Sequence, residues 1–348
     1  MTYTDINANS RPAWPFLTAA AVGLTLATLA VPVSSSASSK KDDGVSAAVR
    51  DGVLDVNGSD GRDAVALRLD AADPNRIQVD VGDDGSADFS FARGRIDAIE
   101  VRTGDGRDTA RIDDANGAFT DTTPTTISGG DGNDSLEGGQ LQIAAENEKY
   151  RGGDGNDLVD GGKGNDTAKL GDGRDTFRWD NGEGSDVIEG QDGRDTMVFN
   201  GAPVDEQVTL TASEGRLTFF RVQGNVTMDT DGVEIVEDNP LGGSDSVTVN
   251  DLTGTDVKHV NLDLTGALGG DAGDGAVDNV VVNGTDGDDD ISVDGTASGA
   301  DVRGLAAAVS VTNADATDTL SVNTLEGADS VATSGVAGLI VKVDGADV

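Results

Sequence analysis

The sequence predicts an all-β fold in which a central solenoid lies between two further β-rich regions. Three observations predict it. A glycine-rich, nine-residue phrase recurs between residues 127 and 201. Segments such as RIQVDV (Arg76–Val81) and RLTFFRVQ (Arg216–Gln223) alternate apolar and polar residues in the flanks, as strands do. No convincing amphipathic helix pattern follows residue 40.

The first 39 residues differ from the rest of the chain. Phe16–Val33 is apolar and uncharged and leads into SSSASS, where Ser35 and Ala37 suit a small-x-small cleavage site. We therefore expect residues 1–39 to be a signal peptide and the mature protein to be secreted and extracellular, either free or held at the cell surface. An uncleaved membrane anchor is the alternative, although the run barely reaches the ~18 apolar residues that a span needs.

The charge balance limits the partners. There are 24 basic and 64 acidic residues, giving a net charge of −40 at pH 7. This charge excludes nucleic acid and anionic membranes as natural partners and favours cations, so we expect no stable membrane insertion once the signal is removed. The chain has no cysteine, so a bound metal must use oxygen ligands. A protein or polysaccharide partner is left open.

The repeated phrase places an aspartate at the sixth of nine positions. The units are GGDGNDSLE from Gly129, GGDGNDLVD from Gly152, GGKGNDTAK from Gly161, LGDGRDTFR from Leu170, NGEGSDVIE from Asn181 and GQDGRDTMV from Gly190. Their eighth positions hold Leu136, Val159, Ala168, Phe177, Ile188 and Met197. A six-residue glycine turn followed by a three-residue strand is too short for a helix, so such units predict a coil with one inward side chain per unit.

So thin a core needs further support. It cannot offset an ordering entropy of ~1–2 kcal/mol per residue or the repulsion between stacked carboxylates. A hard divalent cation answers both needs, because Ca²⁺ accepts six to eight carboxylate and carbonyl oxygens at irregular angles. Mg²⁺ fits less well, since it requires a strict octahedron and keeps its waters. We therefore expect calcium as the cofactor.

The array resembles the RTX (haemolysin-type) calcium-binding nonapeptide repeat, G-G-x-G-x-D-x-U-x, of secreted bacterial proteins. In that family two nonapeptides form one turn of a right-handed parallel β-roll, and Ca²⁺ lies between turns on sixth-position aspartates and turn carbonyls. The resemblance covers residues 127–201 and implies the pairs Asp157–Asp175, Asp166–Asp186 and Asp175–Asp195. It places the metal ligands among Asp134, Asp154, Asp157, Asp166, Asp172, Asp175, Asp186, Asp192 and Asp195. Asp134 is set apart by an eleven-residue insertion, Gln140–Tyr150.

Weaker copies of the phrase occur outside the array. They are centred on Asp63, Asp108, Asp289, Asp318 and Asp329. Each is isolated in the sequence, so we interpret it as a β-turn entering a strand rather than as a calcium site. The exception is Gly284–Ser292, where four aspartates crowd into one turn. DVGDDGSAD (Asp80–Asp88) is interpreted as a hairpin turn.

These features divide the chain into five parts. Residues 1–39 are the signal, 40–126 a β-rich region, 127–201 the calcium-binding β-roll, 202–240 a β-hairpin connector and 241–348 an acidic β-repeat region. The last part fits either a continued solenoid or a β-sandwich, because both contain short alternating strands.

Catalytic signals are weak. A single histidine, His259, cannot build an HExxH or other histidine-based zinc site, and no GxSxG motif occurs. With 64 acidic residues, any carboxylate pair could be proposed, so such pairs are uninformative. We expect a non-enzymatic calcium-binding protein with a structural or adhesive role. The alternative is an extracellular β-helix enzyme, of the polysaccharide lyase or epimerase type, which would need a groove with clustered basic residues.

Overall fold

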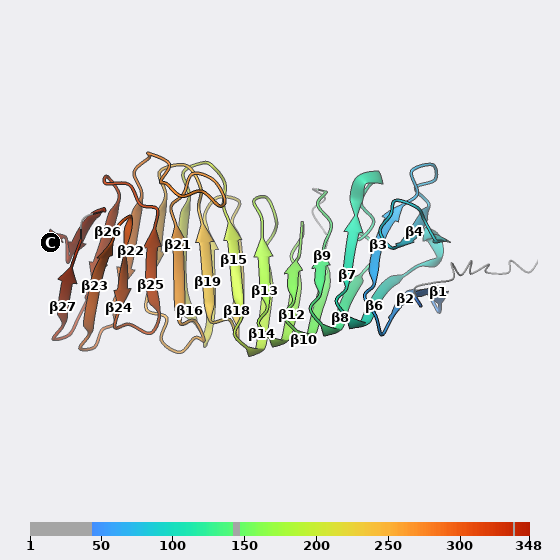
Figure 1. Ribbon diagram of the computed structural model, residues 1–348, viewed down its shortest axis with the longest axis horizontal. Helices are drawn as coiled ribbons and strands as arrows, with labels where there is room; N and C mark the ends of the chain where they lie inside the picture. The colour runs from blue at the N-terminus through green and yellow to red at the C-terminus, as the bar shows by residue number, and fades with distance from the viewer. Residues whose placement is uncertain (1–43, 142–146, 337) are drawn as a thin grey trace, which may run out of the picture. The chain divides into compact units, whose positions relative to one another are not determined.

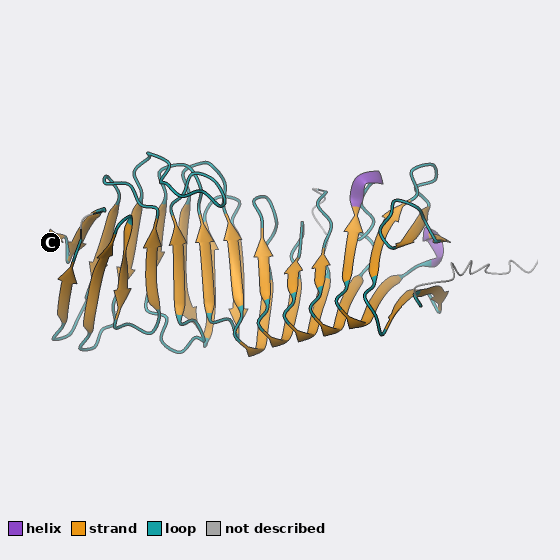
Figure 2. Ribbon diagram, viewed as in Figure 1, coloured by secondary structure: helices purple, strands orange, loops and turns teal. Residues whose placement is uncertain are grey.

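The computed structural model describes residues 44–141, 147–336 and 338–348. Strands dominate these residues, and the only helices among them are two short 3₁₀ segments, η1 (Arg93–Arg95) and η2 (Asp114–Asn116) (Figure 2). No helix in this part of the chain is long and apolar enough to cross a membrane. The described residues belong to one compact unit. The predicted signal peptide lies outside the described residues.

The strands form two large sheets, and the chain passes back and forth between them (Figure 1). Sheet A has 15 strands in the order β1 (Ser46–Arg50), β2 (Val53–Ser59), β6 (Ala98–Gly106), β8 (Thr125–Gly132), β10 (Lys149–Gly155), β12 (Thr167–Gly173), β14 (Val187–Gly193), β18 (Val226–Asp231), β17 (Arg216–Arg221), β16 (Gln207–Ser213), β20 (Ser246–Val249), β22 (Asn279–Asn283), β26 (Thr319–Asn323), β28 (Ile340–Val343) and β29 (Ala346–Asp347). Sheet B has 14 in the order β27 (Ser330–Ser334), β23 (Asp290–Thr296), β24 (Gly299–Arg303), β25 (Ala308–Thr312), β21 (His259–Asp263), β19 (Ile235–Asn239), β15 (Thr196–Asn200), β13 (Thr176–Trp179), β11 (Leu158–Asp160), β9 (Ser135–Glu137), β7 (Thr109–Asp113), β3 (Ala64–Leu69), β4 (Arg76–Val81) and β5 (Phe89–Ala92). The predicted all-β solenoid is confirmed.

Each coil of the central part adds one parallel strand to each sheet. From Gly152 onward, successive nonapeptides therefore alternate between the sheets, and the eighth-position residues form two sets. Ala168 and Ile188 are in register in sheet A. Leu136, Val159, Phe177 and Met197 are in register in sheet B. All six side chains are fully buried, so the two sets build the core between the sheets.

Outside the array the coils are interrupted by antiparallel insertions. Strands β16–β18 form a three-stranded meander within sheet A, where a hairpin connector was expected, and β23–β25 form one within sheet B. At the N-terminal end, β4 and β5 extend sheet B beyond β3, and residues 82–88 form the turn of that hairpin, as predicted for DVGDDGSAD.

The C-terminal region continues the solenoid. Strands β20, β22, β26 and β28 follow one another in parallel register in sheet A. Strands β19, β21 and β25 do the same in sheet B. Of the two folds that the sequence allows for residues 241–348, the structure therefore has the solenoid. The expected divisions at residues 126, 201 and 240 fall within these continuous sheets.

Candidate metal centre

A row of buried aspartates follows the turns that lead from sheet A to sheet B. We call it the first row, and its members are Asp63, Asp108, Asp134, Asp157, Asp175 and Asp195. Along this row, the backbone N–H of each aspartate before Asp195 donates to the Oδ1 atom of the aspartate in the next coil, at 2.7–2.9 Å. The N–H of Asp195 donates to Glu234 Oε2 at 2.7 Å. The sixth position therefore holds neighbouring coils together through one hydrogen bond per coil.

A second row lies at the opposite edge, where sheet B leads back to sheet A. Here the N–H of Glu148 donates to Asp166 Oδ1 at 2.6 Å, and the N–H of Asp166 donates to Asp186 Oδ1 at 2.7 Å. There are two rows because successive nonapeptides alternate between the sheets. The structure thus brings together the pairs Asp157–Asp175, Asp166–Asp186 and Asp175–Asp195 that the resemblance implied.

The second oxygen of most of these carboxylates has no hydrogen-bond partner in the described part of the chain. We call a buried carboxylate oxygen free when it has no hydrogen-bond partner among the described residues. Free oxygens are the Oδ2 atoms of Asp108, Asp134, Asp157, Asp166, Asp175, Asp186 and Asp195, and both carboxylate oxygens of Glu148. Buried polar atoms are nearly always paired, and an unpaired buried charge is costly. A repeated row of free oxygens therefore points to a bound cation.

Burial changes the acidity of the rows. It raises the pKa of Asp157, Asp186 and Asp195 to about 7. The pKa of Asp166 rises further, because the charges of Asp186 and Glu148 add to its burial. Near neutral pH these carboxyl groups must therefore either keep a proton or be neutralised by a cation.

The glycines leave room beside the free oxygens. A Cβ atom placed on Gly152 would lie 2.4 Å from Asp157 Oδ2 and 2.1 Å from the carbonyl oxygen of Leu170 in the next coil. On Gly129 it would lie 2.2 Å from Asp134 Oδ2 and 2.7 Å from the carbonyl oxygen of Gly152. Carboxylate and carbonyl oxygens of neighbouring coils thus converge where a side chain is missing, and such hard oxygen donors fit Ca²⁺.

A family model described as the RTX calcium-binding nonapeptide repeat (4 copies) matches residues 125–140, 145–178 and 181–201. The chain therefore contains RTX repeats. Repeats of this type bind calcium, and the match covers both rows from Asp134 to Asp195. We call residues 125–201 the RTX array. No curated protein matches the chain.

The third-position aspartates of the RTX array lie elsewhere. Asp154, Asp172 and Asp192 are in register on β10, β12 and β14, and their side chains are exposed. The structure does not bring these three predicted ligands into the buried rows with the other six.

Asp63 and Asp108 each stand in a turn that enters a strand, as expected, but they are not isolated in the structure, because both belong to the first row. They stand apart in the sequence since extra strands and turns fill the chain between them. Only Asp108 has a free oxygen, whereas Asp63 Oδ2 accepts hydrogen bonds from the N–H and Oγ of Ser59, at 2.6 and 2.9 Å. Asp289 resembles Asp63, since its Oδ2 accepts the N–H of Thr285 at 2.8 Å. A weak repeat therefore resembles the array only when its carboxylate keeps a free oxygen.

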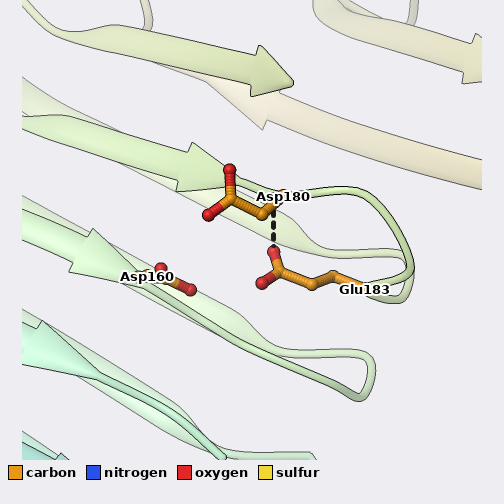
Figure 3. Close-up of side chains that lie close together, drawn as sticks. All are labelled: Asp160, Asp180 and Glu183. Atoms are coloured by element: carbon orange, nitrogen blue, oxygen red, sulfur yellow. Dashed lines mark hydrogen bonds between the residues drawn. The ribbon is translucent and has the colours of Figure 1, made fainter. Parts of the chain in front are cut away.

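Three further acidic side chains lie close together beside the second row. Oxygens of Asp160, Asp180 and Glu183 lie within 4.8 Å of one another, and the N–H of Asp180 donates to Glu183 Oε2 at 2.7 Å (Figure 3). Burial, reinforced by the charge of Asp160, raises the pKa of Glu183 to about 9. All six carboxylate oxygens are paired, with donors from Gln140, Gly162, Arg178, Asp180 and Asn200. This cluster therefore differs from the rows, whose second oxygens are free.

A groove on sheet A crosses the RTX array. Its basic side chains are Arg151 and Lys169, and Asp154 and Asp172 lie beside them. The groove therefore has mixed charge rather than the cluster of basic residues that an acidic sugar would require.

Proposed function

We propose that this is a secreted calcium-binding protein whose RTX array folds when it binds calcium, and that it serves a structural or adhesive role at the cell exterior. The observation that carries the proposal is the row of free aspartate oxygens, one per coil, beside carbonyl oxygens of the next coil. Calcium would supply positive charge and multiple coordination to these oxygens. Two neighbouring coils would share each ion.

Such sharing makes binding and folding one process. Asp157 and Asp175 lie 18 residues apart and meet only when their coils are stacked. Because the site exists only in the folded array, the free energy of binding becomes free energy of folding. An ordered coil supplies half of the next site, so folding is expected to propagate cooperatively along the array.

Calcium titration of the mature chain by calorimetry tests the sites. Asp175→Asn keeps an oxygen for the N–H of Asp157 but replaces the free oxygen with an amide. We expect the affinity for calcium to fall about tenfold to a hundredfold, because Asp175 has row neighbours on both sides and one charged ligand is lost.

Asp63→Asn is the matched control, since the second oxygen of Asp63 is already hydrogen-bonded to Ser59. We expect it to leave calcium binding unchanged, and Asp329→Asn, outside the array, to do the same. Equal losses in all three variants would mean that calcium condenses diffusely on an acidic surface, which would contradict the proposed sites.

Export is supported by the apolar segment before the serines and by the working range of extracellular calcium modules, about 10⁻⁴–10⁻³ M. Such an affinity would leave the array open in the cytosol and close it outside the cell. If Ala37 ends a signal peptide, N-terminal sequencing of the secreted protein should begin near Ser38. Retention of residues 16–33 in a membrane fraction would contradict this prediction.

The enzyme alternative gains no support from the groove on sheet A. A lyase or epimerase of acidic polysaccharides needs clustered positive charge, and Arg151 and Lys169 lie among aspartates. The structural or adhesive role is therefore the better-supported proposal.

A further inference from the structure

A group of buried charges lies beyond the RTX array, in the two coils that follow it. Glu206 stands in the turn between β15 and β16, and Asp245 in the turn between β19 and β20. Asp238 is an inward-facing residue of β19. The three are exposed by 1%, 2% and 0%, respectively. The turn sequences, GAPVDE and PLGGSD, depart from the nonapeptide, and the family match ends at residue 201.

Glu206 and Asp245 repeat the geometry of the aspartate rows. The N–H of Glu206 donates to Asp245 Oδ1 at 2.7 Å, the same distance as between Asp157 and Asp175. Oε2 of Glu206 and Oδ2 of Asp245 are both free oxygens. A Cβ atom on Gly201 would lie 2.3 Å from Glu206 Oε2 and 3.0 Å from the carbonyl oxygen of Pro240. A carboxylate and a carbonyl thus again converge beside a glycine.

Arg221 forms no hydrogen bond with Oε2 of Glu206. Its Nε donates to Glu206 Oε1 at 2.8 Å, its Nη2 contacts the same atom, and the N–H of Ala202 adds a third donor at 3.0 Å. An arginine commonly binds both oxygens of a carboxylate. Here all three donors use one oxygen, while the guanidinium lies 5.6 Å from the ring centre of Trp179. Glu206 Oε2 is therefore left to another ligand.

Asp238 is the independent observation that points to a ligand. It is in register with Phe199 on one side and Leu262 on the other, inside the apolar core. Both of its oxygens are free. The charges of Glu206, Asp245 and Arg221 all act on it, and the first two, with burial, raise its pKa. A fully buried carboxyl without any donor is expensive unless a further group compensates it.

The charges of these side chains do not balance. When all three carboxyl groups are ionised, they face one guanidinium, which leaves two negative charges in a buried site. We propose that Glu206, Asp238 and Asp245, with the Pro240 carbonyl, bind one calcium ion. The ion carries the missing two charges and accepts only oxygen ligands here. Among the described residues, only the Asp160 cluster has three acidic side chains with oxygens within 4.8 Å of one another. The oxygens of Glu206, Asp238 and Asp245 therefore lie further apart, and the ion would draw them together.

The turns that lead from sheet B to sheet A also show where the series of paired acidic residues ends. Two coils beyond Asp245, Asp318 accepts the N–H of Asp278 on Oδ1 at 3.0 Å. Its Oδ2 accepts the N–H of Asp315 at 2.6 Å and is therefore not free. Asp238 has no acidic counterpart in the next coil, where Leu262 occupies the inward position. The proposed site is thus confined to the Glu206 and Asp245 coils.

Counting calcium bound to the full-length chain by equilibrium dialysis tests the proposal. We expect Asp238→Asn to bind one ion fewer than the wild type. It should also gain less thermal stability from added calcium than the wild type does. Glu237→Gln is the matched control, since it removes the same charge from the outward-facing neighbour on β19 and should keep the wild-type count. An unchanged count in Asp238→Asn would overturn the proposal and leave Asp238 as a buried neutral acid.

A second variant covers a failure of Asp238→Asn to fold. Asp245→Asn changes a turn residue, and we expect it too to lose one ion; an unchanged count overturns the proposal. The test is independent of the RTX array. If the array bound no calcium, the wild type would still hold the ion that Asp238→Asn loses. Conversely, a loss in Asp175→Asn alone would support the array and refute this site.

Discussion

Removing calcium with a chelator is expected to unfold the RTX array within the full-length protein, and returning calcium should refold it in one cooperative step. Residues 127–201 hold 17 acidic and 7 basic side chains, and their core consists of the six eighth-position side chains together with Ile127, Tyr150, Leu170, Trp179 and Phe199. Stacking adds a carboxylate with a free oxygen in each coil. Without a cation, the repulsion and the loss of chain entropy should exceed what this core contributes.

Hydrogen exchange measured by mass spectrometry resolves this transition along the chain. In chelator, amides of residues 125–201 should exchange at the rate of an unfolded chain. Those of β3 and β4, which pack Leu67, Ile77 and Val79 into a broader apolar core, serve as the internal reference and should stay protected. Protection of the array that is equal with and without calcium would contradict coupled folding.

The pH dependence of the metal-free array follows from the same carboxyl groups. The pKa of Asp186 is about 7 in the fold against an ordinary 3.8, so the folded chain keeps a proton that the unfolded chain releases. This stability is present below the unfolded pKa and is lost as pH rises through the folded one, on the order of 4 kcal/mol for Asp186. Thermal melting in chelator should therefore occur at a lower temperature at pH 8 than at pH 5. Added calcium should stabilise more at pH 8, since it binds the deprotonated form.

The RTX array could be predicted from the sequence because each unit contains every part of its own structure. Glycine permits the turn, aspartate supplies the oxygens, and the eighth residue fills the core. The first row could not be followed further, since its members are one coil apart in space but 45, 26, 23, 18 and 20 residues apart in the sequence. Sheet pairing fixes the distance between coils, whereas turns and added strands absorb any length of chain.

Two other features could not be predicted from the sequence, for physical reasons. Glu148 and Glu206 occupy row positions as glutamates, so an aspartate pattern passes over them. The solenoid of residues 241–348 was not separable from a sandwich, because alternation shows that one face of a strand is buried but not which strand lies beside it. The free oxygens, by contrast, do have a signal in the sequence: Ser59, whose N–H and Oγ occupy the second oxygen of Asp63, is replaced by Gly104 in the Asp108 unit.

Gly155→Ala is expected to destabilise the calcium-bound array strongly, although it adds only one methyl group. A Cβ atom at this position would lie 1.5 Å from the carbonyl oxygen of Gly132 in the preceding coil and 2.4 Å from its carbon. The backbone of Gly155 also has φ of 151°, which residues with a side chain rarely adopt. The coils would have to separate, which would stretch the hydrogen bond between Asp134 and Asp157. We expect a loss of at least ~3 kcal/mol in urea unfolding at saturating calcium.

Gly85→Ala separates the clash from the backbone effect. Gly85 has φ of 88°, and a Cβ atom there would meet no other described atom within 4 Å. Only the conformational cost of a positive φ applies to it, roughly 1–2 kcal/mol. If the coils stack as tightly as the glycine contacts require, Gly155→Ala should lose more free energy of unfolding than Gly85→Ala. It should also lower the affinity for calcium, because the two aspartates that share an ion move apart. Equal losses in the two variants, with calcium affinity unchanged, would mean that the carbonyl of Gly132 can yield to a side chain and that close stacking is not what holds the metal ligands together.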